Sequence, residues 1–287
     1  MASIRQIKRR VRSVTSIAKV TKAMEMVAAS KMRRSQQRAL AARPYADKMR
    51  EILGDLAKQS SDDEQRHPFL TERPVKNTLI LYLGPNRGLA GGLPGNLARK
   101  AASFALEQES PVKWVTVGKK ARDFIVRTGQ PLIAHFALPD YPELNDTLPV
   151  NRIIADEYLA ENVDRVFLLY PKLVNTALQT PVVRQILPIQ SDELSDITAD
   201  DIDYIYEPSA EGVFAELLPR YIEMTIYAAI LENEACELSA RMVAMHSATD
   251  AANEMIETLT LVYNKARQEQ ITKELLDIVG GVEAMKG

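Results

Sequence analysis

A glycine-rich turn is the clearest pattern in this sequence that could perform chemistry. It reads Gly88-Leu-Ala-Gly91-Gly92-Leu-Pro-Gly95 and follows an apolar run at residues 75–83. A turn of this kind between a first strand and a helix can bind a phosphate through backbone N–H groups. Its spacing fits neither G-x-G-x-x-G nor the P-loop, and no Lys-Ser or Lys-Thr follows it. We therefore interpret it as a structural or partner-contacting loop and expect no nucleotide or other cofactor.

The remaining reactive residue types are scattered. His67, His135 and His246 lie far apart in the sequence, without the spacing of metal ligands. Cys236 has no His at catalytic spacing and is expected to be a small packing residue. The segment 191–203 has six acids and no base, which suits a solvated connection better than a cation site. We expect no metal site and no catalytic residues.

The N-terminal segment is strongly basic. Residues 1–43 contain twelve Lys or Arg and one acid, Glu25, whereas residues 207–287 contain fourteen acids and six bases. Such a basic stretch could bind a nucleic-acid backbone. However, no aromatic residue precedes Tyr45 to stack on bases, and the whole chain has a net charge of -2. The pattern favours contact with acidic protein loops, and we expect no nucleic-acid partner.

Two long helices are predicted at the ends of the chain, and the C-terminal one has the clearer pattern. Residues 220–279 contain no Gly or Pro. Fourteen positions at alternating spacings of three and four form a seam in which only Thr249 is polar, which predicts a coiled-coil strand. The seam is Tyr221, Met224, Ala228, Leu231, Ala235, Leu238, Met242, Met245, Thr249, Ala252, Ile256, Leu259, Tyr263 and Ala266.

The N-terminal segment is the expected partner of this helix. Its stripe is Ile4, Ile7, Val11, Val14, Ile17 or Ala18, Val20 or Thr21, Met24, Val27 or Ala28, Met32 and Ala39, and it is expected to resume after Pro44. An antiparallel pair, with Gln59 near Ser209 and Met1 near Lys265, leaves residues 266–285 as an apolar tip that needs a sleeve. The second helix is expected to start near Ser209, whose side chain can cap it. From there to residue 285 it would be roughly 115 Å long.

Between the two helices, strands and helices alternate. Strands are predicted at 75–83, 112–117, 132–136, 166–170 and 182–189, with a weaker one at 204–206; helices are predicted at 93–109, 119–127 and 150–161. Such alternation predicts a doubly wound, mostly parallel sheet. The expected fold is α/β, a long antiparallel two-helix coiled coil with an inserted Rossmann-like domain. Its predicted parts are 1–59 (first helix), 60–74 (linker), 75–206 (α/β domain) and 207–287 (second helix with an unpaired tip).

The sequence predicts neither a membrane-spanning segment nor a signal peptide. It has no run of eighteen apolar residues, and residues 1–8 lack the apolar core of a signal peptide. A single cysteine excludes an intrachain disulfide and fits a reducing compartment. We expect a chain that neither crosses a membrane nor is secreted.

Several long motifs resemble one family along the whole chain. Thr21-Lys-Ala-Met-Glu-Met-Val-Ala-Ala-Ser-Lys31-Met32 is similar to the N-terminal signature of the gamma subunit of F-type ATP synthase. Leu261-Val-Tyr-Asn-Lys-Ala-Arg-Gln268, with Ile271-Thr-Lys-Glu274 and Ile278-Val-Gly-Gly281, resembles its C-terminal signature. Arg87-Gly-Leu-Ala-Gly-Gly-Leu93 resembles the loop after its first strand, and Tyr204-Ile-Tyr-Glu-Pro208 the entry to its last helix.

This resemblance implies a non-catalytic rotor. The coiled coil would lie on the axis of a ring of three alpha and three beta subunits, and its foot would contact the epsilon subunit and the membrane ring of c subunits. By resemblance, Arg267, Gln268, Thr272 and Arg87 contact beta, Met24 lies on the shaft where packing affects coupling, and Tyr206 and Glu207 belong to the foot. Residues 188–206 are too few for the chloroplast regulatory insertion. A bacterial chain is therefore implied, peripheral on the cytoplasmic face of the plasma membrane and attached to it only through the c ring.

Overall fold

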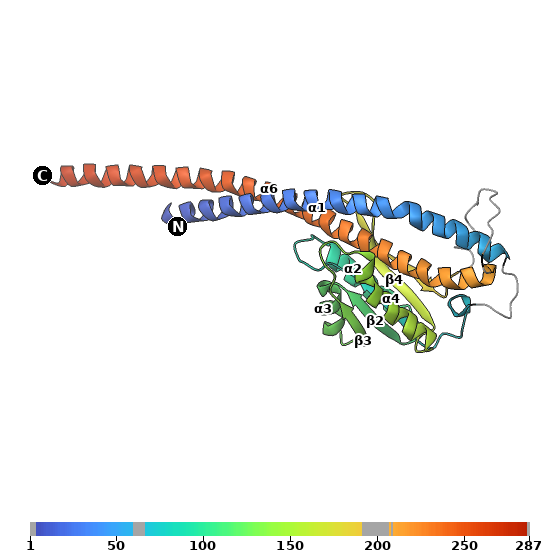
Figure 1. Ribbon diagram of the computed structural model, residues 1–287. Helices are drawn as coiled ribbons and strands as arrows, with labels where there is room; N and C mark the ends of the chain where they lie inside the picture. Colours follow the sequence, from blue (N-terminus) through green and yellow to red (C-terminus); the bar gives the residue numbers. More distant parts are fainter. Residues whose placement is uncertain (1–3, 60–66, 191–206, 208, 286–287) are drawn as a thin grey trace. The chain divides into compact units, whose positions relative to one another are not determined.

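The fold consists of two long helices and a five-stranded sheet (Figure 1). The computed structural model describes residues 4–59, 67–190, 207 and 209–285. The long helices are α1 (Ile4–Gln59) and α6 (Ala210–Ala284). Between them lie η2 (Pro68–Leu70), β1 (Thr78–Leu83), α2 (Leu93–Leu106), β2 (Val112–Val117), α3 (Lys119–Arg127), β3 (Leu132–Phe136), α4 (Leu144–Leu159), β4 (Arg165–Leu173) and β5 (Gln179–Leu187). The chain divides into two compact units, Met1–Ala28 with Met242–Gly287, and Ala29–Arg241.

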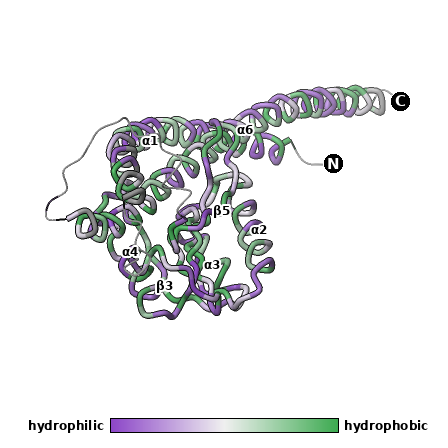
Figure 2. The backbone as a smooth tube through the Cα atoms, turned by 90° about the vertical axis from the view of Figure 1, so that its right-hand side faces the viewer, coloured by the Kyte–Doolittle hydropathy of each residue, from purple (hydrophilic) through white to green (hydrophobic). Residues whose placement is uncertain are grey.

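In the first unit, α1 and α6 pack along a seam with heptad spacing. The covered α1 positions are Ile4, Ile7, Val11, Val14, Ala18, Thr21, Met24 and Ala28. Where the sequence left two candidates for one seam position, the smaller residue is covered and the larger one is more than half exposed. The exposed alternatives are Ile17, Val20 and Val27. Small seam residues let the two backbones approach closely. Figure 2 shows hydrophobic and hydrophilic residues alternating along α6.

Two polar contacts fix the antiparallel register of this unit. The hydroxyl oxygens of Thr21 and Thr249 lie 2.8 Å apart, and Nδ1 of His246 lies 3.3 Å from Oε1 of Glu25. The predicted alignment was approximate, because Met1 near Lys265 and Gln59 near Ser209 would place Thr21 opposite Met245 to Ser247, two to four residues from Thr249. A heptad pattern repeats along the helix and cannot decide which turn meets which. The hydrogen bond between the two threonine hydroxyls selects the observed register and satisfies the one polar position of the α6 seam.

The second unit contains a mixed sheet with strand order β3-β2-β1-β4-β5. β1 pairs in parallel with β2 and β4, β2 pairs in parallel with β3, and β5 is antiparallel to β4. All six residues of β1 are buried, as expected for a central strand covered on both faces. The predicted mostly parallel, doubly wound sheet is confirmed.

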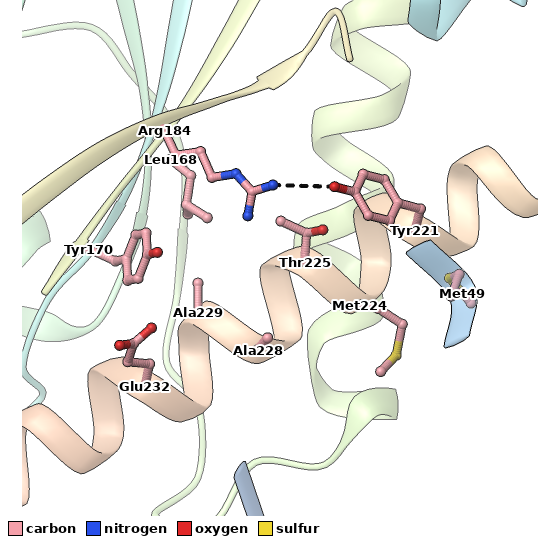
Figure 3. A pocket seen from close by; sticks show the side chains of 10 residues that line it. All are labelled: Met49, Leu168, Tyr170, Arg184, Tyr221, Met224, Thr225, Ala228, Ala229 and Glu232. Carbon is pink, nitrogen blue, oxygen red and sulfur yellow. Dashed lines mark hydrogen bonds between the residues drawn. The ribbon is translucent and has the colours of Figure 1, made fainter. Parts of the chain in front are cut away.

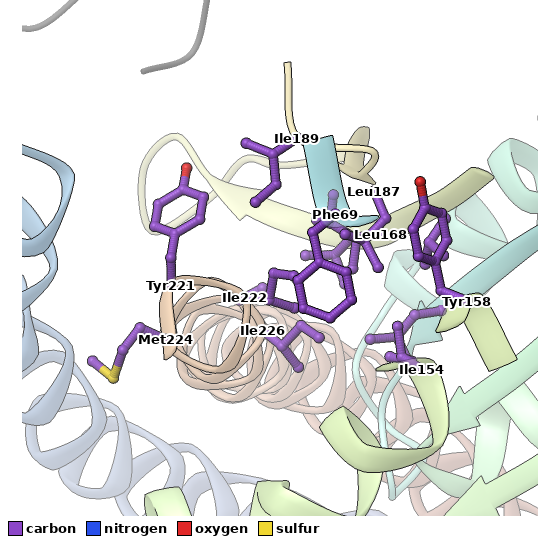
Figure 4. Packing of buried hydrophobic residues seen from close by; sticks show 14 of the residues in the cluster. Phe69, Ile154, Tyr158, Leu168, Leu187, Ile189, Tyr221, Ile222, Met224 and Ile226 are labelled. Atoms are coloured by element: carbon purple, nitrogen blue, oxygen red, sulfur yellow. The ribbon is translucent and has the colours of Figure 1, made fainter. Parts of the chain in front are cut away.

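Helices cover both faces of this sheet. Ile80 and Tyr82 of β1 pack with Trp114 of β2 against α2 and α3. Leu79, Leu81 and Leu83, which point to the other face, pack against α4 and the first part of α6. Figure 4 shows this second core, in which the side chains of Phe69, Ile154, Tyr158, Leu168, Leu187, Ile189, Ile222 and Ile226 converge. The first part of α6 is therefore a layer of the α/β domain as well as a coiled-coil strand.

Most element ends agree with the sequence-based prediction. β2, α3 and β3 have the predicted bounds. The α4 helix starts at Leu144 rather than 150, because Glu143 and Asp146 form a capping box in which the Glu143 N–H donates to Asp146 Oδ2 at 2.8 Å. The predicted N-cap of α6 is present, since the Gly212 N–H donates to Ser209 Oγ at 3.1 Å. The predicted strand at 204–206 lies outside the described residues.

One predicted seam position was wrong. Ala228 is exposed, whereas its neighbours Ala229 and Ile230 are buried. The heptad count assumed a single partner for α6, but over residues 221–241 this helix also packs against the sheet. A second partner buries residues off the seam and changes which face is covered.

Candidate functional site

The loop after β1 is held by the side chain of Glu237 on α6. Its two carboxylate oxygens accept from the backbone N–H groups of Asn86, at 3.0 Å, and Arg87, at 3.4 Å. The guanidinium of Arg241 donates to Glu237 Oε1 at 2.6 Å and to the carbonyl of Gly88 at 3.2 Å. One carboxylate and one guanidinium on successive turns of α6 thus bind the loop backbone.

This loop lies at the point where the strand order of the sheet reverses, with β2 on one side of β1 and β4 on the other. Doubly wound domains usually bind their ligands at the carboxyl ends of the strands at such a point. Here the amides of Asn86 and Arg87 donate to Glu237, and the side-chain amide of Asn233 donates to the Gly84 carbonyl at 3.5 Å. Two backbone N–H groups of the loop are therefore bound by a side chain of α6, as in a structural or partner-contacting loop.

The side chain of Arg87 is 67% exposed. Its Nη2 lies 3.1 Å from Oδ1 and 3.4 Å from Oδ2 of Asp140, in the segment before α4. Lys31 of α1 donates to the same carboxylate at 2.7 Å. The hydrogen bond from Lys31, with the charges of Lys31 and Arg87, holds the pKa of Asp140 below its ordinary value although partial burial opposes the shift. An ionised Asp140 therefore joins α1 to the Arg87 loop.

A second carboxylate of α6 belongs to Glu234, a half-buried residue whose two carboxylate oxygens are buried and make no hydrogen bond to a described residue. Burial raises the pKa of Glu234 from 4.5 to about 7, and the charges of Asp140 and Glu237 act in the same direction. The charge of the Arg38 guanidinium, on α1, lowers the pKa of Glu234 but does not compensate. Glu234 is therefore partly protonated in the folded chain near neutral pH.

Glu234 is expected to make the stability of the chain depend on pH. Between about pH 4.5 and 7 the folded state holds a proton that the unfolded state has lost, so the free energy of unfolding should fall as pH rises and level off above pH 7. A pKa change of this size corresponds to about 3 kcal/mol. Chemical unfolding of the chain at pH 5, 6, 7 and 8 measures it, with Glu234→Gln beside wild type.

The Gln variant should lose most of this slope, because an amide does not titrate. Glu216→Gln, which changes an exposed residue of the same helix, is the matched control and should keep the wild-type slope. An unchanged slope in Glu234→Gln would show that other groups cause the dependence.

A cavity of about 180 Å³ lies between α1, α6 and the sheet (Figure 3). Arg184 donates to the hydroxyl of Tyr221 at 3.2 Å, and Glu232 accepts from the Leu173 N–H at 3.0 Å. Arg184 and Glu232, the two charged residues of the cavity, are therefore each bound to a neighbouring part of the chain. The residues that line the cavity do not include a nucleophile beside a general base. The lining residues are Met49, Leu168, Tyr170, Arg184, Tyr221, Met224, Thr225, Ala228, Ala229 and Glu232.

The remaining reactive side chains have structural partners. Cys236 is buried and donates to the Pro171 carbonyl at 3.3 Å, and burial raises the pKa of its thiol far above the usual range. His67 accepts from the Phe69 N–H at 3.2 Å, and His135 lies 3.2 Å from the Thr116 hydroxyl. Within the described ranges, no group of three or more His, Cys, Asp or Glu side chains could hold a metal ion.

The other predicted partner-contacting residues lie on the coiled coil. Arg267, Gln268 and Thr272 are exposed on α6, and none of their side chains makes a hydrogen bond or ion pair to another described residue. Met24 is half-buried on the α1 seam. Arg267, Gln268, Thr272 and Met24 belong to the first unit, and Arg87 belongs to the second. Glu207 is exposed, and Tyr206 lies outside the described residues.

Sequence reasoning missed Asp140 and Glu237, which hold the Arg87 loop. Glu237 stood next to the heptad seam and Asp140 in an irregular segment, and each contacts a residue more than fifty positions away. Lys31 was part of a recognised motif, but nothing in that motif indicates that it pairs with Asp140. Only the folded chain brings these three residues to one loop.

Comparisons with known proteins agree with these features. A family model described as ATP synthase matches residues 3–285. The ATP synthase gamma chain of Dehalococcoides mccartyi (strain CBDB1) is 52% identical over 286 residues, covering 99% of this chain and 100% of the relative. No helix in the described part of the chain is long and apolar enough to cross a membrane.

Two solved structures share the fold. A chain in the Tetrahymena thermophila mitochondrial ATP synthase central stalk and c ring superposes with a TM-score of 0.60 at 23% identity, covering 80% of this chain and 99% of its own. A chain in the Euglena gracilis mitochondrial ATP synthase OSCP, F1 and c-ring structure gives 0.68 at 19% identity, covering 98% and 94%. The family model covers almost the whole chain, and the Dehalococcoides mccartyi gamma chain is 52% identical over its full length, so this chain belongs to the family of ATP synthase gamma chains.

Proposed function

We propose that this chain is the central rotor shaft of an F-type ATP synthase. It couples ion flow through a c ring to the conformational cycle of three alpha and three beta subunits. The observation that supports this most strongly is the end of α6. In the register set by Thr21 and Thr249, Ile4 lies opposite Ala266, and the described residues beyond it have no α1 partner. Seven large apolar side chains there are about half exposed or more: Ile271, Leu275, Leu276, Ile278, Val279, Val282 and Met285.

An apolar helix end of this kind needs a surrounding protein, and a ring of alpha and beta subunits provides one. A single asymmetric shaft inside a three-fold ring presents a different surface to each of three identical catalytic sites. Rotation then shifts each site between its states, provided that the shaft binds those states with unequal affinity. The chain itself performs no bond chemistry in this scheme, and its function lies in the contacts that it makes.

Within this proposal, the residues have separate roles. Arg267, Gln268 and Thr272 hydrogen-bond beta near the tip, and Arg87 makes a second contact to beta. Met24 keeps the seam packed so that torque is transmitted. Tyr206 and Glu207 contact the epsilon subunit and the c ring. The chain is then peripheral at the cytoplasmic face of a bacterial plasma membrane, attached through the c ring alone.

Affinity capture tests the proposal against the two other classes that the sequence allowed. The tagged full-length chain and a variant lacking residues 267–287 would be incubated with alpha and beta subunits, a dinucleotide and duplex DNA. We expect the full-length chain to capture alpha and beta and the shortened chain to capture less. Salt-sensitive DNA binding, or dinucleotide binding without alpha and beta, would contradict a rotor.

A further inference from the structure

The loop that contains Arg87 is held by both long helices. From α6, Glu237 binds the backbone N–H groups of Asn86 and Arg87. From α1, Lys31 binds Asp140, and Asp140 binds the Arg87 side chain. The backbone of the loop is therefore fixed by one long helix and its exposed side chain by the other.

The segment that contains Asp140 is itself attached to α1. The ring of Tyr141 lies beneath two α1 cations, with Lys31 Nζ 5.7 Å and Arg38 Cζ 4.9 Å from its centroid. The side-chain amide of Asn86 donates to the Leu138 carbonyl at 3.3 Å, which joins this segment to the loop. Asp140 thus lies on a short segment that contacts α1 on one side and the Arg87 loop on the other.

The combined charge of Lys31, Asp140 and Arg87 leaves the Arg87 guanidinium able to bind an anionic partner. Only Nη2 of its guanidinium donates to Asp140, so Nε and Nη1 have no hydrogen-bond acceptor among the described residues. Lys31 shares the same carboxylate, which gives the three side chains a net charge of +1. Without Lys31, Asp140 would neutralise Arg87 and weaken its attraction for an anionic acceptor.

We propose that Asp140 is a positioning residue for Arg87, and that Lys31 connects this position to α1. Asp140 selects one rotamer of the long, exposed Arg87 side chain. The Arg87 N–H groups that do not bind Asp140 then point outward before the partner arrives. Because Lys31 is on the shaft helix, a displacement of α1 would move Asp140 and with it the guanidinium. This inference rests on the proposed contact between Arg87 and beta.

A double-mutant cycle in the assembled complex with alpha and beta tests this inference. ATP turnover would be measured for Arg87→Ala, Asp140→Asn and the double variant, at equal assembly. Asp140→Asn should lower turnover roughly 2-fold to 10-fold, the range expected for ordering one long side chain. The double variant should be no slower than Arg87→Ala, because Asp140 acts through Arg87. Asp140→Glu, which keeps the carboxylate, should recover part of the loss.

Asp123→Asn is the matched control. Asp123 also forms an ion pair, with Arg122 at 2.8 Å, but this partly buried pair on α3 involves neither Arg87 nor Asp140, so its replacement should leave turnover unchanged. Thermal unfolding of Asp140→Asn should stay near wild type, because exposed ion pairs contribute little to stability. An Asp140→Asn variant too unstable to assemble would contradict a positioning role.

The turnover of these variants distinguishes the positioning role of Asp140 from the proposed contact between Arg87 and beta. Unchanged turnover in Arg87→Ala would refute the proposed beta contact of Arg87. A slower Arg87→Ala, combined with either an unaffected Asp140→Asn or losses that multiply in the double variant, would refute the positioning role alone.

Discussion

Replacing Arg267 and Gln268 together with Ala is expected to slow ATP turnover of the assembled complex by about 10-fold to 100-fold. Both side chains are exposed near the end of α6 and lack a partner in the described parts of the chain, so their donors are available to another subunit. A hydrogen bond to a charged group contributes roughly 1.5–3 kcal/mol. If such bonds form in one rotary position and break in the next, their loss slows the steps that depend on them. Steady-state ATP hydrolysis by wild-type and variant complexes measures this.

The apolar residues of the same helix end provide the comparison. Replacing Ile271, Leu275 and Ile278 with Ala removes contact area but no directional bond, so a smaller loss of turnover is expected. Folding of the isolated chain should be almost unchanged in both variants, because all of these residues are exposed. If the apolar variant were the slower one at equal assembly, directed hydrogen bonds would not be the main contact of the tip.

Gly118→Ala is expected to destabilise the second unit by about 2–5 kcal/mol. Gly118 precedes α3 with a φ of 92°, and a Cβ built there would lie 2.1 Å from the Gly84 carbonyl oxygen. The left-handed backbone costs an L-residue roughly 1–2 kcal/mol. The clash adds about 1–3 kcal/mol or more, because Gly84 is itself confined by Ala121, 2.9 Å from its own added Cβ. Thermal unfolding should show a Tm lower by roughly 10 °C.

Gly95→Ala is the control for this glycine. Gly95 lies in the first turn of α2 with open space where a Cβ would be, so Ala should stabilise the helix by about 0.5–1 kcal/mol. Equal Tm values for Gly118→Ala and wild type would mean that the loops containing Gly84 and Gly118 can move apart without a loss of stability.

The architecture of the α/β unit was largely predictable, because its strands and helices have local signals. β2, for example, is a short run of β-branched and aromatic residues that ends at Gly118, which has the positive φ needed before α3. The start of α4 was not predictable to the residue. The sequence predicted a helix from residue 150, whereas the capping box at Glu143 and Asp146 starts it at Leu144.

Features that depend on long-range partners could not be read from the sequence. Periodicity identified the seam of α6, but it gave the register only to within about one helical turn and failed to show that Ala228 is exposed, because both depend on what packs opposite. The contacts to Arg87 were missed for the same reason. The roles of Arg267, Gln268, Thr272, Met24, Tyr206 and Glu207 come from resemblance and stay predictions.

Direct observation of rotation is the most direct test of the shaft proposal. The alpha and beta ring would be fixed to a surface, and a particle attached to a cysteine introduced by Leu106→Cys on α2, where the side chain is 86% exposed. Cys236 is buried and should not compete for the label. The account predicts that ATP drives the particle through repeated steps in one direction. A complex that hydrolyses ATP while the particle keeps a fixed orientation would contradict it.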